Sequence, residues 1–196
     1  MKKHSYETLE QAAREIFLHD ENQKALAYLS PTILIYFYHD GDVAGQRKVI
    51  EVFERFYSQY RGYLKSHFWD GMRRFARLNH TAFSKKTVKM LKEAERWESL
   101  AGCLTSDETG EYAGEYFIET LTAYPSAPQD RALSYLQLTL PLQLLKTAAG
   151  RKEFEEWVKY LCKQVTIYHG YAGLTVNLPY AYHRYQFHEY EITRRY

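Results

Sequence analysis

The stretch "LSYLQLTLPL", Leu133 to Leu142, alternates apolar and polar side chains with a period of two. The alternation sorts the residues onto two faces, with Leu136, Leu138 and Leu140 on one and Tyr135, Gln137 and Thr139 on the other. Such a pattern is typical of a strand in an antiparallel sheet that has one covered face and one open face. Pro141 then ends the strand or opens a helical turn.

Outward from this stretch, strand patterns interleave with helical ones. Apolar residues at helical spacing predict amphipathic helices over Ala44–Tyr60 and Lys152–Val165. Shorter patterns predict helices over Tyr6–Leu18 and, after the N-cap Ser84, over Lys85–Trp97. Further strands are predicted around Ile33–Phe37 (between Pro31 and Gly41), in "YLKSHFW", in a hairpin of Glu98–Thr105 with Tyr112–Tyr124, and in "GLTVNLP".

These elements predict an α+β fold, a largely antiparallel β-sheet covered on one face by helices. The chain of 196 residues contains no internal repeat and no linker, so we expect a single domain over residues 1–196. The amino-terminal segment reads as an amphipathic helix and not as a secretory signal. No stretch has the apolar length of a membrane span. A cytoplasmic protein that does not interact with membranes is the expectation.

Charge is distributed unevenly along the chain, although the net charge is only +2. Residues 61–92 contain nine Lys and Arg against one acid, whereas residues 97–130 contain seven acids and no Lys or Arg. The 19 tyrosines suit either a recognition surface or an aromatic core. The opposite charges of residues 61–92 and 97–130 are the most informative electrostatic feature of the sequence.

Motifs of common enzyme classes are missing from the sequence. It has no phosphate-binding loop, dinucleotide fingerprint, HExxH or GxSxG. "GYAG" at 170–173 precedes a strand, whereas a phosphate-cradling loop precedes a helix. We therefore expect no catalytic residues, no cofactor and no resident metal, and predict that the protein is not an enzyme.

Histidines and cysteines provide weak alternatives. A metal-dependent enzyme could use His169, His183 and His188, but their spacings of 14 and 5 residues fit no common ligand motif. His39–Asp40 and His67 could support acid–base chemistry, yet no nucleophile stands beside them. The two cysteines, Cys103 and Cys162, read as small core residues.

A nucleic-acid-binding module is the stronger alternative. The basic segment 61–92 interleaves cations with aromatic residues, as single-strand binders do. Its candidate contacts are Arg73, Arg74, Arg77, Lys85 and Lys86. The competing interpretation is a solvated basic face whose aromatics, Phe68, Trp69, Phe75 and Phe83, point into the core.

The acidic segment favours a protein partner. Its acids alternate with tyrosines, so that charge could steer a cationic partner while aromatic rings provide the buried contacts. A solvated hairpin neutralised by the chain's own basic segment is the plain alternative. The candidate partner-binding residues are Asp107, Glu108, Glu111, Tyr112, Glu115 and Tyr116, joined by Tyr180 and Tyr182 from the carboxy-terminal region.

Four blocks of sequence resemble the type VI secretion immunity family that is paired with VRR-Nuc nuclease effectors. They are "ALSYLQLTLPLQLL", "FEEWVKYLCKQVTIYHGYAGLTVNLP", "LIYFYHDG" and "VIEVFERFYSQYRGYL", which together extend over about residues 32–190. HGYAG, in its strand context, is the most specific of these motifs. Family members continue further, so we expect a short or truncated member ending in "EITRRY".

The resemblance implies an immunity protein that binds a cognate nuclease effector and blocks it without chemistry, by occluding its DNA-binding cleft. It implies no direct binding of nucleic acid by the chain itself. HGYAG is then interpreted as structural: Gly170 and Gly173 would let the backbone turn between helix and strand, while His169 and Tyr171 satisfy local hydrogen bonds.

Overall fold

The computed structural model describes residues 6–16, 18–19, 22–39, 43–69, 72–79, 85, 100–122 and 132–180. The elements in chain order are α1 (Tyr6–Ile16), β1 (Leu18–His19), β2 (Ala25–His39), α2 (Val43–Tyr60), β3 (Ser66–Trp69), β4 (Ala76–Arg77), β5 (Leu100–Thr105), β6 (Phe117–Thr122), β7 (Ala132–Thr139), η2 (Leu142–Lys146), α4 (Ala148–Gln164) and β8 (Ile167–Asn177). The predicted helix over 85–97 lies outside the described residues except at Lys85.

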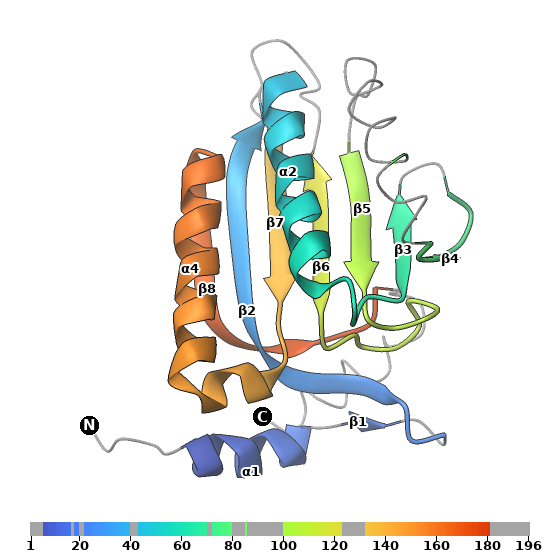
Figure 1. Ribbon diagram of the computed structural model, residues 1–196, viewed down its shortest axis with the longest axis vertical. Helices are drawn as coiled ribbons and strands as arrows, with labels where there is room; N and C mark the ends of the chain where they lie inside the picture. Colours follow the sequence, from blue (N-terminus) through green and yellow to red (C-terminus); the bar gives the residue numbers. More distant parts are fainter. Residues whose placement is uncertain are drawn as a thin grey trace.

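Within the described residues, the strands form one eight-stranded sheet whose pairings are all antiparallel. Its order is β1-β2-β7-β6-β5-β3-β4, and β8 pairs with β2. Helices α2 and α4 lie side by side against one face, whereas α1 lies near the end where β2 and β8 bend (Figure 1). The predicted α+β class is confirmed.

The core lies between the sheet and the two long helices. On β7, Leu136, Leu138 and Leu140 are buried, as the alternation predicts. They pack with side chains from β2, α2 and α4, including Ile33, Ile35, Phe37, Val49, Phe53, Phe56, Trp157 and Leu161. The apolar residues that recur at every second position of the strands therefore meet, in one buried layer, those that recur about every 3.6 positions of the helices.

A hydrogen-bonded pair of aromatic residues joins α2 to α4. The indole Nε1 of Trp157 donates to the Tyr60 hydroxyl at 2.8 Å, and that hydroxyl donates to the Glu153 carboxylate. Gln59 Nε2 also donates to this carboxylate at 2.7 Å. These contacts fix the two helices relative to each other over the sheet, because their polar atoms are satisfied across the helix interface.

Strand β2 is longer than predicted, and Pro31 lies within it. Pro31 pairs with Leu174 of β8, and its carbonyl accepts from the Leu140 amide at 3.0 Å. The ladder with β7 ends at the Thr32–Thr139 pair, so the missing N–H of Pro31 faces the side where β7 has already ended. The prediction that Pro31 bounds the strand is wrong for this reason.

The predicted turn at HGYAG is also wrong. Strand β8 begins at Ile167 and runs through Gly170 and Gly173, paired with β2 except for a register shift at Tyr168. Pairing with a neighbouring strand here overrides the turn preference of glycine. Gly173 makes room for a neighbouring side chain: a Cβ there would lie 2.5 Å from the Tyr171 hydroxyl, which folds back to donate to the Leu174 carbonyl at 2.7 Å, so a larger residue would displace this exposed ring.

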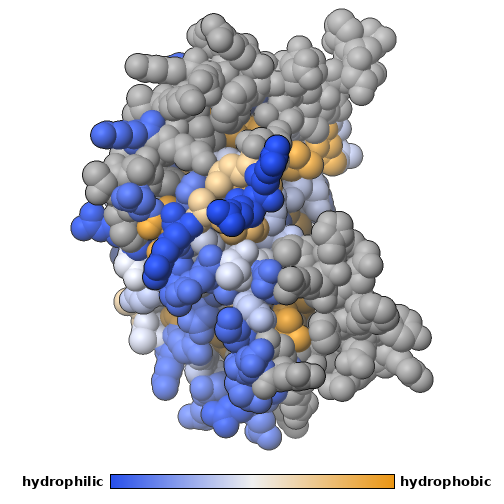
Figure 2. Space-filling view, turned by 90° about the vertical axis from the view of Figure 1, so that its right-hand side faces the viewer, coloured by the Kyte–Doolittle hydropathy of each residue, from blue (hydrophilic) through white to orange (hydrophobic). Residues whose placement is uncertain are grey.

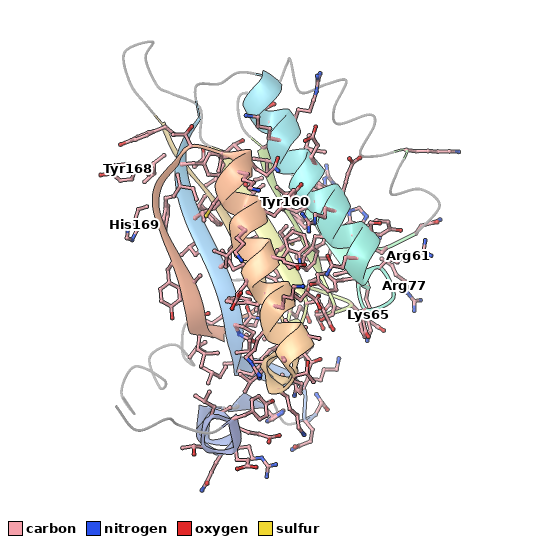
Figure 3. The ribbon with its side chains drawn as sticks, turned by 60° about the vertical axis from the view of Figure 1, so that its left-hand side comes forward. Arg61, Lys65, Arg77, Tyr160, Tyr168 and His169 are labelled. Carbon is pink, nitrogen blue, oxygen red and sulfur yellow. The ribbon has the colours of Figure 1, made fainter. Side chains whose placement is uncertain are left out.

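The sheet face opposite α2 and α4, called the open face below, carries tyrosines. Tyr36 of β2 packs against Tyr135 of β7 and stacks on His169 of β8. The side chains of Tyr168 and His169 project from β8 away from the helices (Figure 3). Large apolar side chains exposed on the strands of this sheet are Tyr38, Leu121, Leu133, Tyr168 and Tyr171.

Candidate functional site

The loop of residues 106–116, called the acidic loop below, connects β5 to β6 and carries the predicted partner-binding acids. It is longer than the predicted hairpin turn, since β6 begins at Phe117 and not at Tyr112. The acidic loop lines a hollow with a volume of about 640 Å³, together with Lys24, Gly62, Tyr63 and Lys65. The structure therefore brings Asp107, Glu108, Tyr112, Glu115 and Tyr116 around one hollow, while Glu111 lies on the loop outside its lining.

The acidic loop is held by its own hydrogen bonds. Asp107 Oδ2 accepts from the amide and the hydroxyl of Thr109, at 2.9 and 3.0 Å. The Ser66 hydroxyl donates to the Asp107 carbonyl at 2.6 Å, and the Ser106 amide donates to the Tyr116 carbonyl at 2.9 Å. A loop fixed in this way loses little conformational entropy when it meets a partner.

A glycine lets the acidic loop pack against the basic segment. Gly110 has a φ of 72°, and a Cβ there would lie 2.3 Å from the ring of Phe75. The positive φ favours glycine, and the ring of Phe75 would have to shift to admit a larger residue. Residues far apart in the sequence are thereby held at one end of the sheet.

An aromatic cluster forms one wall of the hollow. Tyr116 stacks on Tyr63, with ring centroids 4.5 Å apart and planes at 16°, and it also packs against Tyr60. Burial raises the pKa of Tyr116 to about 12, and the neighbouring tyrosine and acids act in the same direction. Tyr63 is 58% exposed and was not predicted from the sequence, because its role depends on stacking with a residue from the acidic loop.

The basic segment folds against the acidic loop. Lys65 Nζ lies 3.8 Å from Glu108 Oε1, and Lys24 Nζ lies 4.5 Å from the ring centre of Tyr112. Both members of the ion pair are more than half exposed, so the pair contributes little to stability. Arg61, Lys65 and Arg77 gather near the end of α2 (Figure 3). The alternative interpretation, in which the chain's own basic residues neutralise the acidic segment, therefore holds for part of the acidic charge.

Tyr180 lies at a second hollow, on the open face of the sheet. Its ring packs against Phe68, Phe75 and Phe117 at centroid distances between 5.4 and 6.4 Å. Here it lines a cavity of about 500 Å³ together with Glu119. Tyr182, the other carboxy-terminal candidate, lies outside the described residues.

A family model described as "TsiV: Type VI immunity for VRR-NUC" matches residues 48–196, which is most of the chain. The chain belongs to the TsiV family. The match includes the acidic loop, the cavity beside Tyr180 and strand β8, and it begins within α2, after the "LIYFYHDG" strand.

Among solved structures, the T6SS protein PA0821 of Pseudomonas aeruginosa is similar to this chain, with a TM-score of 0.70 and 15% sequence identity. The likeness covers 90% of this chain and 52% of that protein, so the chain spans about half of its length. At this identity the likeness shows a shared fold. No curated protein matches the sequence.

In this TsiV-family chain, the phenylalanines and the tryptophan in the described part of the basic segment, residues 61–69, 72–79 and 85, pack against other side chains, as the competing interpretation expects. Trp69 is buried against Phe53 of α2, while Phe68 and Phe75 pack on each other. Arg73, Arg74 and Arg77 are exposed around a shallow hollow. Figure 2 looks onto the side where β3 and β4 lie and shows hydrophilic side chains next to apolar ones. Lys86 and Phe83 lie outside the described residues.

The histidines and cysteines form no reactive cluster in the described part of the chain. No group of three His, Cys, Asp or Glu side chains there could hold a metal ion. His169 stacks on Tyr36, and His67 is buried in β3. Asp40, His183 and His188 lie outside the described residues.

One of the two cysteine predictions is wrong. Cys103 is buried in β5, and burial raises the pKa of its thiol. Cys162 is exposed on α4, because the helix turns this position away from the sheet.

Among the described helices, none combines the length and the apolar character that a membrane-spanning helix needs.

Glu119 supplies a testable pH dependence. Burial raises its pKa from about 4.5 to about 7, although the Tyr135 hydroxyl donates a hydrogen bond to the carboxylate. The folded state holds the proton more tightly than the unfolded state, so its stability falls as pH rises from about 4.5 to about 7. Above that window the charged carboxylate costs about 3 kcal/mol.

We therefore expect Glu119→Gln to stabilise the protein at about pH 8 by up to this amount and to have little effect at about pH 5. Urea denaturation across that range measures the difference. Glu155→Gln, which removes an exposed carboxylate from α4 and its surface ion pair with Lys159, is the matched control and should change both values by less than about 0.5 kcal/mol. Parallel stability curves for the wild type and Glu119→Gln would contradict the assignment.

Proposed function

We propose that this chain is an immunity protein that binds a VRR-Nuc nuclease effector of a type VI secretion system and neutralises it. Membership of the TsiV family, over residues 48–196, is the observation that carries this proposal. The action is stoichiometric occlusion: the protein needs no catalytic residue, no metal and no cofactor of its own. Residues 1–196 act as one immunity-type domain, in the cytoplasm.

The acidic loop supports a binding mode. A nuclease cleft that holds DNA must present cations to the phosphates. The hollow formed by the acidic loop offers Asp107, Glu108 and Glu115 beside the stacked Tyr63–Tyr116 pair. Opposite charge speeds the encounter, and tyrosines supply buried contact area. In the proposed complex this surface occupies the DNA-binding cleft, with Tyr180 at the margin of the interface, and Tyr182 stays a candidate contact from the sequence.

A titration of nuclease activity tests the proposal. The catalytic domain of the cognate effector is mixed with increasing amounts of this chain, and cleavage of plasmid DNA is followed. We expect cleavage to stop at one equivalent and the two proteins to elute together from a sizing column. An unrelated nuclease should keep its activity in the same mixture.

Two outcomes would contradict the proposal. Loss of effector activity at a small fraction of one equivalent would indicate that the chain acts as an enzyme on the effector. Retained activity, together with salt-dependent binding of DNA by the isolated chain, would favour the basic segment as a nucleic-acid-binding module, since such binding weakens steeply with salt.

A further inference from the structure

A cavity of about 500 Å³ lies on the open face of the sheet, between strands β6 and β7 and the segment that follows β8. Its volume is within the range of small-ligand sites. Aromatic and aliphatic side chains share its lining with a carboxylate, an amide and two phenols, and the surface they expose to the cavity is more polar than apolar: Phe117, Glu119, Tyr135, Gln137, Val176, Leu178, Pro179 and Tyr180.

Glu119 is the polar centre of this cavity. It stands directly across from Gln137 in the β6–β7 ladder and from Cys103 in the β5–β6 ladder. The titratable groups that act on it or on its hydrogen-bond partner Tyr135 are the phenols of Tyr135, Tyr36 and Tyr180 and the thiol of Cys103. Within the described residues no basic side chain forms an ion pair with Glu119. Among the described residues, the carboxylate therefore faces neutral groups.

A carboxylate in such surroundings selects its ligand by charge. Burial without a counter-ion is costly, and a cation that enters the cavity offsets this cost. Aromatic rings such as those of Tyr135, Tyr180 and Phe117 add favourable contacts for a lysine or arginine side chain. An anion would meet the carboxylate with repulsion, and a purely apolar group would leave it without a counter-ion.

The cavity adjoins the acidic loop. Asn177, at the end of β8, donates from Nδ2 to the carbonyl of Gly114 in the loop at 2.8 Å. Phe75 packs on both Tyr180 and Gly110, so it joins the cavity rim to the loop tip. A partner that occupies the acidic hollow can therefore reach this cavity with a neighbouring side chain.

We propose that the Glu119 cavity is an anchor pocket that receives one lysine or arginine side chain of the nuclease effector. This inference rests on the proposed function and adds to the acidic loop a second contact, on the open face of the sheet. The cationic group pairs with the Glu119 carboxylate, and its aliphatic stem lies along the aromatic lining.

Affinity for the effector tests the pocket. Removing one member of a buried charge pair should weaken the complex by roughly 30-fold at about pH 8 in Glu119→Gln. The wild-type complex should weaken by roughly tenfold between about pH 8 and about pH 6, because Glu119 must release its proton before it can pair with the cation. Glu119→Gln should lose this pH dependence, whereas Glu155→Gln on α4 should behave as the wild type. Equal affinities and equal pH profiles for all three proteins would overturn the inference.

A second arm uses the isolated chain and does not depend on the effector. The carboxyl-carbon resonance of Glu119 is followed by NMR while n-butylguanidinium is added. Its titration midpoint should move to lower pH in the presence of the probe. An unchanged midpoint would mean that the cavity takes no cation, even if the effector binds. If the effector does not bind the wild type but the probe does shift the midpoint, the proposed function fails and the cation pocket stands.

Discussion

Reversing the acidic side chains Asp107, Glu108, Glu111 and Glu115 to lysine is expected to weaken effector binding by at least about 100-fold. Each reversal turns attraction toward a cationic cleft into repulsion, and juxtaposed like charges cost several kcal/mol in total. The association rate should fall most at low salt, because steering acts over about a Debye length. The association rate and the affinity are both measured by passing the chain over immobilised effector at a series of salt concentrations.

The reversal needs two controls. Asp107 also accepts hydrogen bonds from Thr109, so its replacement could disturb the loop itself. A triple variant that keeps Asp107 separates charge from loop structure and should retain most of the effect. Reversal of four exposed acids elsewhere, Glu7, Glu51, Glu155 and Glu156, changes the net charge equally and should leave the affinity nearly unchanged. If this second set weakens binding as much, net charge and not the acidic loop determines recognition.

Trp157→Ala is expected to produce the largest loss of stability, about 3–5 kcal/mol. Trp157 is 1% exposed, packs against Phe56 and Tyr160, and stacks on Tyr60. Alanine would leave a cavity between the two helices and the sheet, and it would remove one of the two donors to the Tyr60 hydroxyl, the other being Gln59 Nε2. Domains of this size are stable by about 5–15 kcal/mol, so the variant should lose a large part of that margin.

Urea denaturation of Trp157→Ala and Trp157→Phe separates the cost of the cavity from the cost of the lost hydrogen bond. Phenylalanine keeps most of the apolar volume and removes the indole donor, so its cost should be about 1–2 kcal/mol. The open-face variant Tyr168→Ala, at a side chain that is 64% exposed, should be within about 0.5 kcal/mol of the wild type. A loss below about 1 kcal/mol for Trp157→Ala would show that α4 does not hold the core together.

The sequence alone predicted the strands and helices that have one buried face and one exposed face. The alternation over Leu133–Leu142 and the helical spacing over Ala44–Tyr60 are both visible in the chain, because a strand or helix with one covered face must repeat its apolar residues with its own period. The family motifs similarly lie within single segments. From these local patterns follow the α+β class, the antiparallel sheet, the helix-covered face and the resemblance to the TsiV family.

Only the tertiary structure decided what depends on pairing between distant segments. The strand through HGYAG forms because β2 pairs with it, although its glycines favour a turn. Tyr63 becomes part of the acidic hollow by stacking on Tyr116, and Lys65 meets Glu108 because β3 pairs with β5. Glu119 reads in the sequence as one more acid of a negative segment. The order of the strands places it across from Gln137, beneath Tyr180, where its neighbours and not its own chemistry set its pKa.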